Sequence, residues 1–213
     1  MIVYNKSEIR ENLTIDNIFD LLEEKASNLL PGEHGMLALD WHNGNRSLLS
    51  GSDLAGVLIG LTIHTKPEEI YRAYLESTAF GAKIIMNAYQ ECGMQINEVV
   101  ASGGLPKRNP LMMQIYADVL NKPIHVSQTD QAPAIGAAIL GAVSAGIENG
   151  GHRTIGCAIQ HMAQPIEIVY YPIKENVLVY QTLFNLYEKL CYYFGSQEVQ
   201  VMKTLRQLRQ DSH

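Results

Sequence analysis

The sequence predicts an α/β fold, and residues 98–146 carry most of that prediction. A short apolar strand at 99–102 runs into the glycine pair Gly103-Gly104, and a helix follows. A second apolar strand, at 123–127, leads into a helix rich in alanine and glycine. Strands that alternate with helices over short connections are typical of a mostly parallel sheet covered by helices.

The segment before this stretch predicts a helix, a strand, a loop and a second helix. Thr14 is suited to cap a helix that runs to about residue 30. Apolar residues at 35–40 predict a short strand, and the sequence WHNGNR at 41–46 contains an Asn-Gly turn signal. The next apolar run, at 54–60, is read as a short helix capped by Asp53.

The longest helix is predicted to begin at Lys66-Pro67 and to end near Gly93. Small residues around Ser77 and Gly81 predict that another element packs closely against this helix. The same reasoning applies to the later helix that follows residue 127. There Asp130 is the expected N-cap and Gly146 the expected stop. The small residues of this helix that are expected to allow close packing are Gly136, Ala137, Gly141 and Ala142.

The C-terminal segment predicts a short strand at 167–171 and a helix over 175–194, with a charged amphipathic tail after Gly195. Tyr180 and Tyr187 have helical spacing and are expected in the core. Residues 147–163 favour no particular element.

Composition excludes several function classes. The 213 residues carry a formal net charge of −6, which disfavours a nucleic-acid partner because such proteins present a basic face. No apolar run is long enough to span a bilayer, and no signal peptide is evident, so we expect no membrane partner. The three cysteines, Cys92, Cys157 and Cys191, are far apart, which favours reduced thiols and a cytoplasmic location.

The common catalytic and phosphate-binding motifs are absent from the sequence. It contains neither GxxxxGK[ST] nor GxGxxG, and its seven histidines show no metal-ligand spacing. His125 falls inside a predicted strand. Asp40 ends the strand predicted at 35–40, where catalytic carboxylates often occur, but a structural hydrogen bond or simple exposure explains a single aspartate better.

The glycine pair is the one candidate binding feature. Gly103 and Gly104 lack a Cβ, so their backbone can adopt positive φ and lie against a ligand. Asn109 is a good N-cap for the helix that Pro110 opens. With Lys107 and Arg108 just before it, that helix start favours an anion or a polar ligand edge. From spacing alone, a plain strand-to-helix turn is the slightly better explanation, because a single Gly-Gly pair is a weak signal.

The residues themselves resemble a known family. The stretch ASGGLPKRNPLMMQIYADVLNKPIHVSQTDQAPAIGAAILGAVSAG is similar to the second-half signature of the FGGY carbohydrate kinases, and LDWHNGNRS and GLTIHTKPEEIYRAYLESTAFGAK support it in order. Within that family, the resemblance is strongest to the members that phosphorylate the ketose L-ribulose. It covers roughly residues 37–146, and the tail YYPIKENVLVYQTLFNLYEKL also fits.

The resemblance implies an actin-like, ribonuclease-H-like ATPase fold of which this chain is the second, C-terminal lobe only. It divides the chain into an N-terminal helical segment or connector at 1–34, a nucleotide-binding core at 35–176 and a helical tail at 177–213. ATP and Mg²⁺ are the implied cofactors, and the nucleotide and an N-terminal kinase lobe are the implied partners. A homo-oligomer is a further possibility.

The resemblance also implies which residues meet ATP. Gly103 and Gly104 would lie against the adenosine, and Lys107, Arg108 and Asn109 would border the adenine or ribose. The LDWHNGNR loop would lie near the same side of the pocket. The family's phosphate loops and its catalytic aspartate have no counterpart here, so no catalytic residue is assigned. The chain could alternatively be a non-catalytic nucleotide-binding or assembly module, or the lobe of a related ketose kinase.

Overall fold

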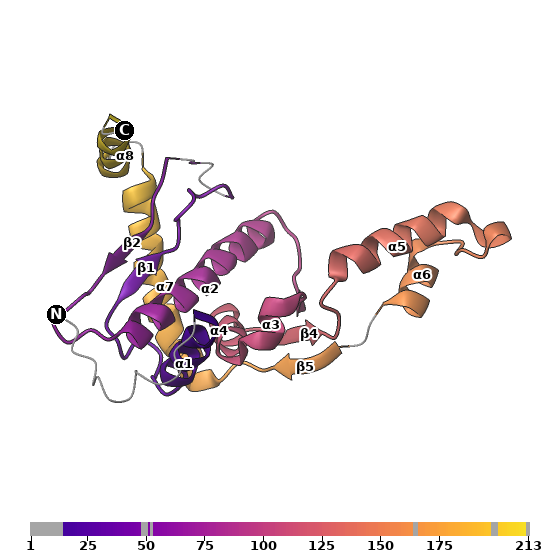
Figure 1. Cartoon of the computed structure of the whole chain (residues 1–213), viewed down its shortest axis with the longest axis horizontal. Helices are drawn as coiled ribbons and strands as arrows, with labels where there is room; N and C mark the ends of the chain where they lie inside the picture. The colour runs from indigo at the N-terminus through magenta and orange to yellow at the C-terminus, as the bar shows by residue number, and fades with distance from the viewer. Residues whose placement is uncertain (1–14, 48–50, 52, 164–165, 197–199, 212–213) are drawn as a thin grey trace.

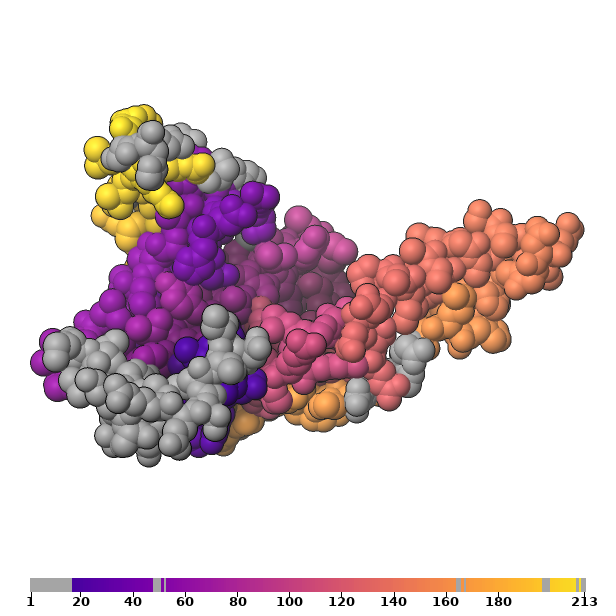
Figure 2. All heavy atoms as spheres, in the orientation of Figure 1, coloured from indigo at the N-terminus to yellow at the C-terminus, as the bar shows by residue number. Residues whose placement is uncertain are grey.

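The computed structural model describes residues 15–47, 51, 53–163, 166–196 and 200–211, so the predicted cap Thr14 lies outside the described part. Two parts of different character are visible (Figure 1). We call α5 and α6, within residues 132–162, the arm, and the remaining described residues the core lobe. Figure 2 shows the arm as a narrow projection from one side of the bulkier core lobe.

Helix α2 (Pro67–Glu91) is the centre of the core lobe, and its prediction is confirmed. The Glu69 carboxylate accepts a hydrogen bond from the Lys66 amide at 2.7 Å, which satisfies a free N–H group at the helix start. Gly93, with φ +85°, lies just beyond the C-cap. Three further helices pack against α2: α1 (Ile15–Ser27), α4 (Pro110–Leu120) and α7 (Lys174–Gly195).

Aromatic rings fill the space between α2 and α7. The Phe80 ring lies 6.1 Å from Tyr180, 6.1 Å from Phe184 and 5.3 Å from Tyr187, measured between ring centroids. Ser77 and Ala79 are fully buried, as their small size predicted for this helix. Burial of such large rings supplies the main apolar contribution to the stability of the core lobe.

The run at 54–60 is a strand and not the predicted helix. Strand β2 (Val57–Ile59) pairs antiparallel with β1 (Leu37–Leu39), with Ala38 opposite Leu58. The β-branched residues of this run suit a strand, and so short a helix gains little stability without packing. The periodicity of so short an apolar run does not distinguish a helix from a strand, and pairing with β1 stabilises the strand.

A second sheet has the strand order β3-β4-β5, formed by β3 (Val99–Ala101), β4 (Ile124–Ser127) and β5 (Ile166–Tyr170). β3 and β4 are parallel, whereas β4 and β5 are antiparallel. The α/β class is therefore confirmed, but the expectation of a mostly parallel sheet was wrong for the described strands. The chain returns from the arm antiparallel to β4, which the local pattern could not show.

The two faces of this sheet differ in their surroundings. On the inner face, Ile124 and Val126 are buried against Met113 and Leu120 of α4. On the outer face, Val100 is opposite His125, and Val100 is 57% exposed. His125 does lie in the sheet, as predicted.

A buried polar cluster, made of His34, Arg72, Glu76 and Tyr180, ties the core lobe together. The Glu76 carboxylate accepts hydrogen bonds at 3.0 Å from His34 Nε2, Arg72 Nε and the Tyr180 hydroxyl. Arg72 also donates to the backbone oxygen of Ala26 in α1 at 2.8 Å. Since His34 and Glu76 are 0% and 1% exposed, this cluster replaces water as the partner of the buried charges.

The arm consists of α5 (Ala132–Ala145), a short 3-10 turn η1 (Ile147–Asn149) and α6 (Ile155–Met162). Gly146, with φ +72°, ends α5 as predicted. The predicted cap Asp130 is wrong, because the N-cap is Gln131 and the Asp130 carboxylate binds Lys107 instead. Of the small residues expected to allow close packing, Ala142 is approached by the backbone of Gly151, whereas a Cβ at Gly136 or Gly141 would meet nothing within 4 Å.

The tail forms α8 (Val201–Asp211). Its Met202 is 5% exposed, and the Met202 sulfur accepts a hydrogen bond from the Ala55 amide at 3.2 Å. The strand predicted before Pro172 and the helix predicted over 175–194 correspond to β5 and α7. Within the described part of the chain, we find no helix with both the length and the apolar character needed to cross a membrane.

Candidate functional site

The candidate site is the connection from β3 to α4. Gly103 has φ +101°, a conformation that favours glycine, and Gly104 begins the short helix α3 (Gly104–Arg108). A Cβ built on either glycine would meet no atom within 4 Å. Both glycines therefore border open space, which leaves their backbone accessible to a ligand.

Asn109 is the N-cap of α4, as the sequence predicted. Its Oδ1 accepts a hydrogen bond from the Met112 amide at 2.7 Å. Its Nδ2 donates to the Tyr71 hydroxyl at 2.7 Å, and the residue is 5% exposed. Because both ends of the amide have protein partners, Asn109 holds the end of the α3 turn against α2.

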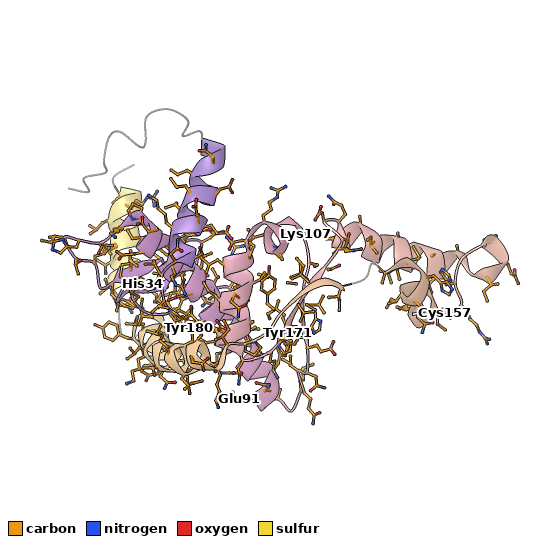
Figure 3. The ribbon with its side chains drawn as sticks, turned by 90° about the horizontal axis from the view of Figure 1, so that it is seen from below. His34, Glu91, Lys107, Cys157, Tyr171 and Tyr180 are labelled. Carbon is orange, nitrogen blue, oxygen red and sulfur yellow. The ribbon has the colours of Figure 1, made fainter. Side chains whose placement is uncertain are left out.

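Lys107 and Arg108 lie at the end of α3. The Lys107 ammonium is 3.1 Å from the Asp130 carboxylate and also donates to the Gln128 backbone oxygen. This ion pair links α3 to the loop at the base of the arm, where Figure 3 shows Lys107. Arg108 is exposed. Sequence reasoning missed the ion pair because it assigned Asp130 to a helix cap.

A separate hollow of about 440 Å³ lies beside the loop that follows β1. It is lined by Asp40 and Arg46 together with Tyr116 of α4 and Tyr187 and Cys191 of α7. The Ser77 hydroxyl donates to the Asp40 carboxylate at 3.3 Å, so Asp40 has a structural hydrogen bond. Residues 103–109 do not line this hollow.

Burial changes the acidity of the side chains around this hollow. It raises the pKa of the Cys191 thiol to about 12. It also raises the pKa values of the Tyr116 and Tyr187 hydroxyls. These groups stay protonated near neutral pH, so they can donate hydrogen bonds but do not act as nucleophiles or bases there.

The described residues do not supply a metal centre. Among them, no group of three His, Cys, Asp or Glu side chains is placed to hold a metal ion. We therefore assign no magnesium ligand to this part of the chain. The open backbone at Gly103 and Gly104 does fit a flat polar ligand such as a nucleoside, because no side chain fills that space.

Comparison with known proteins shows where this arrangement belongs. Residues 3–145 match the family described as "FGGY family of carbohydrate kinases, C-terminal domain". The chain belongs to the FGGY family of carbohydrate kinases. This family membership confirms the resemblance noted from the glycine turn and the segments around it.

Members of this family named ribulokinase are similar over nearly the whole chain. The ribulokinase of Geobacillus thermodenitrificans (strain NG80-2) is 50% identical over 190 residues, which are 89% of this chain and 34% of that protein. The ribulokinase of Staphylococcus aureus (strain Mu3 / ATCC 700698) is 48% identical over 206 residues, 97% of this chain and 36% of that protein. The chain thus spans about a third of the length of these relatives.

Solved structures of FGGY-type sugar kinases share the fold. A ligand-bound xylulose kinase from Lactobacillus acidophilus matches with a TM-score of 0.74 and 21% identity, over 88% of this chain and 37% of that chain. A gluconate kinase from Lactobacillus acidophilus matches with a TM-score of 0.71 and 20% identity, over 90% of this chain and 37% of that chain. The predicted C-terminal lobe of the actin-like ATPase fold is confirmed.

Proposed function

We propose that this chain is the ATP-binding lobe of a ribulokinase, which transfers the γ-phosphoryl group of ATP to the terminal hydroxyl of L-ribulose. The products are ADP and L-ribulose 5-phosphate. The observation that carries the proposal is the 50% identity with a protein named ribulokinase over 89% of this chain. The solved xylulose kinases, at 21–22% identity, support the fold but do not favour xylulose as the sugar.

In this proposal the glycine turn receives the adenosine. The backbone of Gly103 and Gly104 lies against the nucleoside, and the exposed Arg108 borders the adenine or ribose. Lys107 and Asn109 border the same site while their side chains fix the turn through Asp130 and Tyr71. The proposal also includes the division of the chain into an N-terminal segment at 1–34, a nucleotide-binding core at 35–176 and a helical tail at 177–213.

Phosphoryl transfer needs more than this one wall of a nucleotide site. The reaction depends on positioned phosphates, Mg²⁺ and a group that orients or deprotonates the sugar hydroxyl. Mg²⁺ would neutralise the developing charge on the phosphates. We assign none of the catalytic groups to this chain, so we expect the isolated chain to bind ATP weakly and to lack kinase turnover.

The first test is a coupled ADP-release assay of the pure chain with ATP, Mg²⁺ and L-ribulose. We expect no ADP release above the rate without sugar. Sugar-dependent turnover by the pure chain would contradict the picture of a lobe that requires the rest of a kinase.

The second test is calorimetry of ATP binding to Gly104→Val. Gly104 does not have positive φ and its surroundings are open, so valine fits the protein and intrudes only on a ligand beside the turn. Gly156→Val in α6 is the matched control, because the nearest atom to its added Cβ, Thr154 Oγ1, is 4.0 Å away. We expect loss of binding only in Gly104→Val. Equal ATP affinity in both variants would leave the turn a purely structural feature.

A second candidate function, a non-catalytic assembly module, is favoured by the exposed apolar surface of the arm. Calorimetry separates the two functions. If the wild-type chain binds no ATP but associates with another polypeptide, the assembly role is the better description of the isolated chain.

A further inference from the structure

The arm presents an apolar surface that nothing in the described structure covers. Helix α5 has the sequence APAIGAAILGAVSA and contains no charged residue. Nevertheless, only Ile139 of this helix is buried. An uncharged helix that is exposed over most of its circumference is unusual in a soluble protein, because such helices normally bury their apolar sides.

The two sides of α5 have different surroundings. One side faces α6, where Ile139 is 8% exposed and Ala158 of α6 is fully buried. On the opposite side, which we call the outer face of the arm, Leu140 is 60% exposed and Ala137, Gly141 and Ser144 are also exposed. The open space at Gly141 would let the backbone of another element approach closely.

The sheet next to the base of the arm also exposes an apolar side chain. Among the described strands, β3 pairs with β4 alone, and Val100 on the outer face of the sheet is 57% exposed. Sheets that contain parallel strands are usually covered on both faces. Within the described structure, the free edge of β3, the outer face of the sheet and the outer face of the arm are therefore all left uncovered.

The lengths of the relatives indicate which polypeptide could cover the exposed surface of the arm. The chain matches only 34–36% of the two ribulokinases, and in one of them the match extends over 97% of this chain, so it includes the arm. About two thirds of such a kinase therefore lies outside this chain and is available to pack on the exposed surface. A second copy is less suited, because two chains of formal charge −6 repel each other.

We propose that the outer face of the arm is the surface on which the remaining part of the kinase packs, with Leu140 as its central apolar contact. This inference rests on the proposed function, because it takes the partner to be the rest of a ribulokinase. The Lys107–Asp130 ion pair at the base of the arm then connects this docking surface to the glycine turn.

The experiment uses this chain and the part of the Geobacillus thermodenitrificans ribulokinase that it does not match. The two polypeptides are co-expressed, and their affinity is measured by sedimentation. We expect Leu140→Asp to weaken the complex about tenfold or more, because a charge replaces a central apolar contact. Leu178→Asp on α7, where the leucine is 68% exposed, is the matched control and should leave the affinity unchanged.

The variants must first be shown to fold. Because Leu140 and Leu178 are both exposed, neither substitution should shift the unfolding midpoint of the isolated chain. With folding intact, equal affinity of the two variants would overturn the proposal, as would the absence of any complex with the wild-type chain. A wild-type homodimer that Leu140→Asp dissolves would also overturn it, in favour of a second copy as occupant.

Kinase activity of the complex separates this inference from the proposed function. A complex that forms through Leu140 but does not phosphorylate L-ribulose contradicts the ribulokinase function and keeps the docking surface. L-ribulose phosphorylation that Leu140→Asp does not impair keeps the function and contradicts the docking surface.

Discussion

The core lobe and the arm use similar residues and reach opposite degrees of burial. In α2, small residues have partners: Ser77 and Ala79 are fully buried, and a Cβ at Gly81 would lie 3.6 Å from the Tyr187 hydroxyl. In α5, a Cβ added to Gly136 or Gly141 would meet no atom within 4 Å. Small apolar residues thus indicate that a helix can be approached closely, but they do not indicate whether the approaching element belongs to the same chain.

The largest expected contrast between the two regions is in thiol reactivity. Burial raises the pKa of Cys191 in the core lobe to about 12, whereas Cys157 in the arm is exposed. At pH 8 we expect Cys191 to react with a disulfide reagent at least about tenfold more slowly than Cys157, because the Cys191 thiol is buried and the thiolate is the reactive form. Timed labelling and mass spectrometry of peptides measure both rates. Similar rates would mean that α7 opens as readily as the arm.

The buried polar cluster provides the largest expected effect on stability. Glu76→Gln removes the negative charge that faces Arg72, so we expect a loss of about 3–5 kcal/mol in the free energy of unfolding. Urea unfolding measures it. The control is Glu148→Gln in the arm, where the carboxylate is exposed and the change should stay within about 0.5 kcal/mol. A loss below about 1 kcal/mol for Glu76→Gln would show that the cluster is not essential to the core lobe.

A substitution within the arm should have a smaller and local effect. Ile139→Ala truncates the one buried side chain of α5, and we expect about 1–2 kcal/mol of lost local stability, less than in a large packed core because the arm is small. Hydrogen exchange should accelerate about tenfold or more in α5 and α6 but remain unchanged in α2. Equal acceleration in α2 would show that the two regions unfold as one unit.

The smallest expected effect is a gain in the local stability of α5. Gly136→Ala places a methyl group in open space within a helix, so we expect about 0.5–1 kcal/mol of added local stability in α5. Slower hydrogen exchange in α5 measures it. Gly146→Ala is the opposite control, because φ +72° at the C-cap disfavours alanine and should destabilise the arm. If Gly136→Ala also destabilises α5, then the isolated arm already has a neighbour at that position.

Local signals in the sequence predicted most elements of the fold. The Lys66-Pro67 start of α2, the glycine turn and the Asn109 cap depend on residues within one or two helical turns of each other, so each could be predicted. The error at 54–60 has a different origin, because β2 becomes a strand by pairing with β1.

The candidate site was predictable in position but not in its contacts. The sequence placed Lys107 beside the turn, yet its partner Asp130 follows a separate strand and could not be paired with it by spacing. The exposure of the arm could not be predicted from the sequence either. An apolar pattern predicts that a helix is covered, but it does not identify the covering element.

The hydrogen bond from Arg72 to the Tyr180 hydroxyl joins residues that are 108 positions apart in the chain. Proteins are synthesised from the N-terminus, so α2 leaves the ribosome long before the segment that completes the cluster. Until Tyr180 emerges, the cluster lacks one of its hydrogen-bond partners, and α7 does not yet cover α2. Closure of the core lobe on the ribosome therefore waits for α7, and a ribosome stalled before residue 180 should hold a protease-sensitive chain.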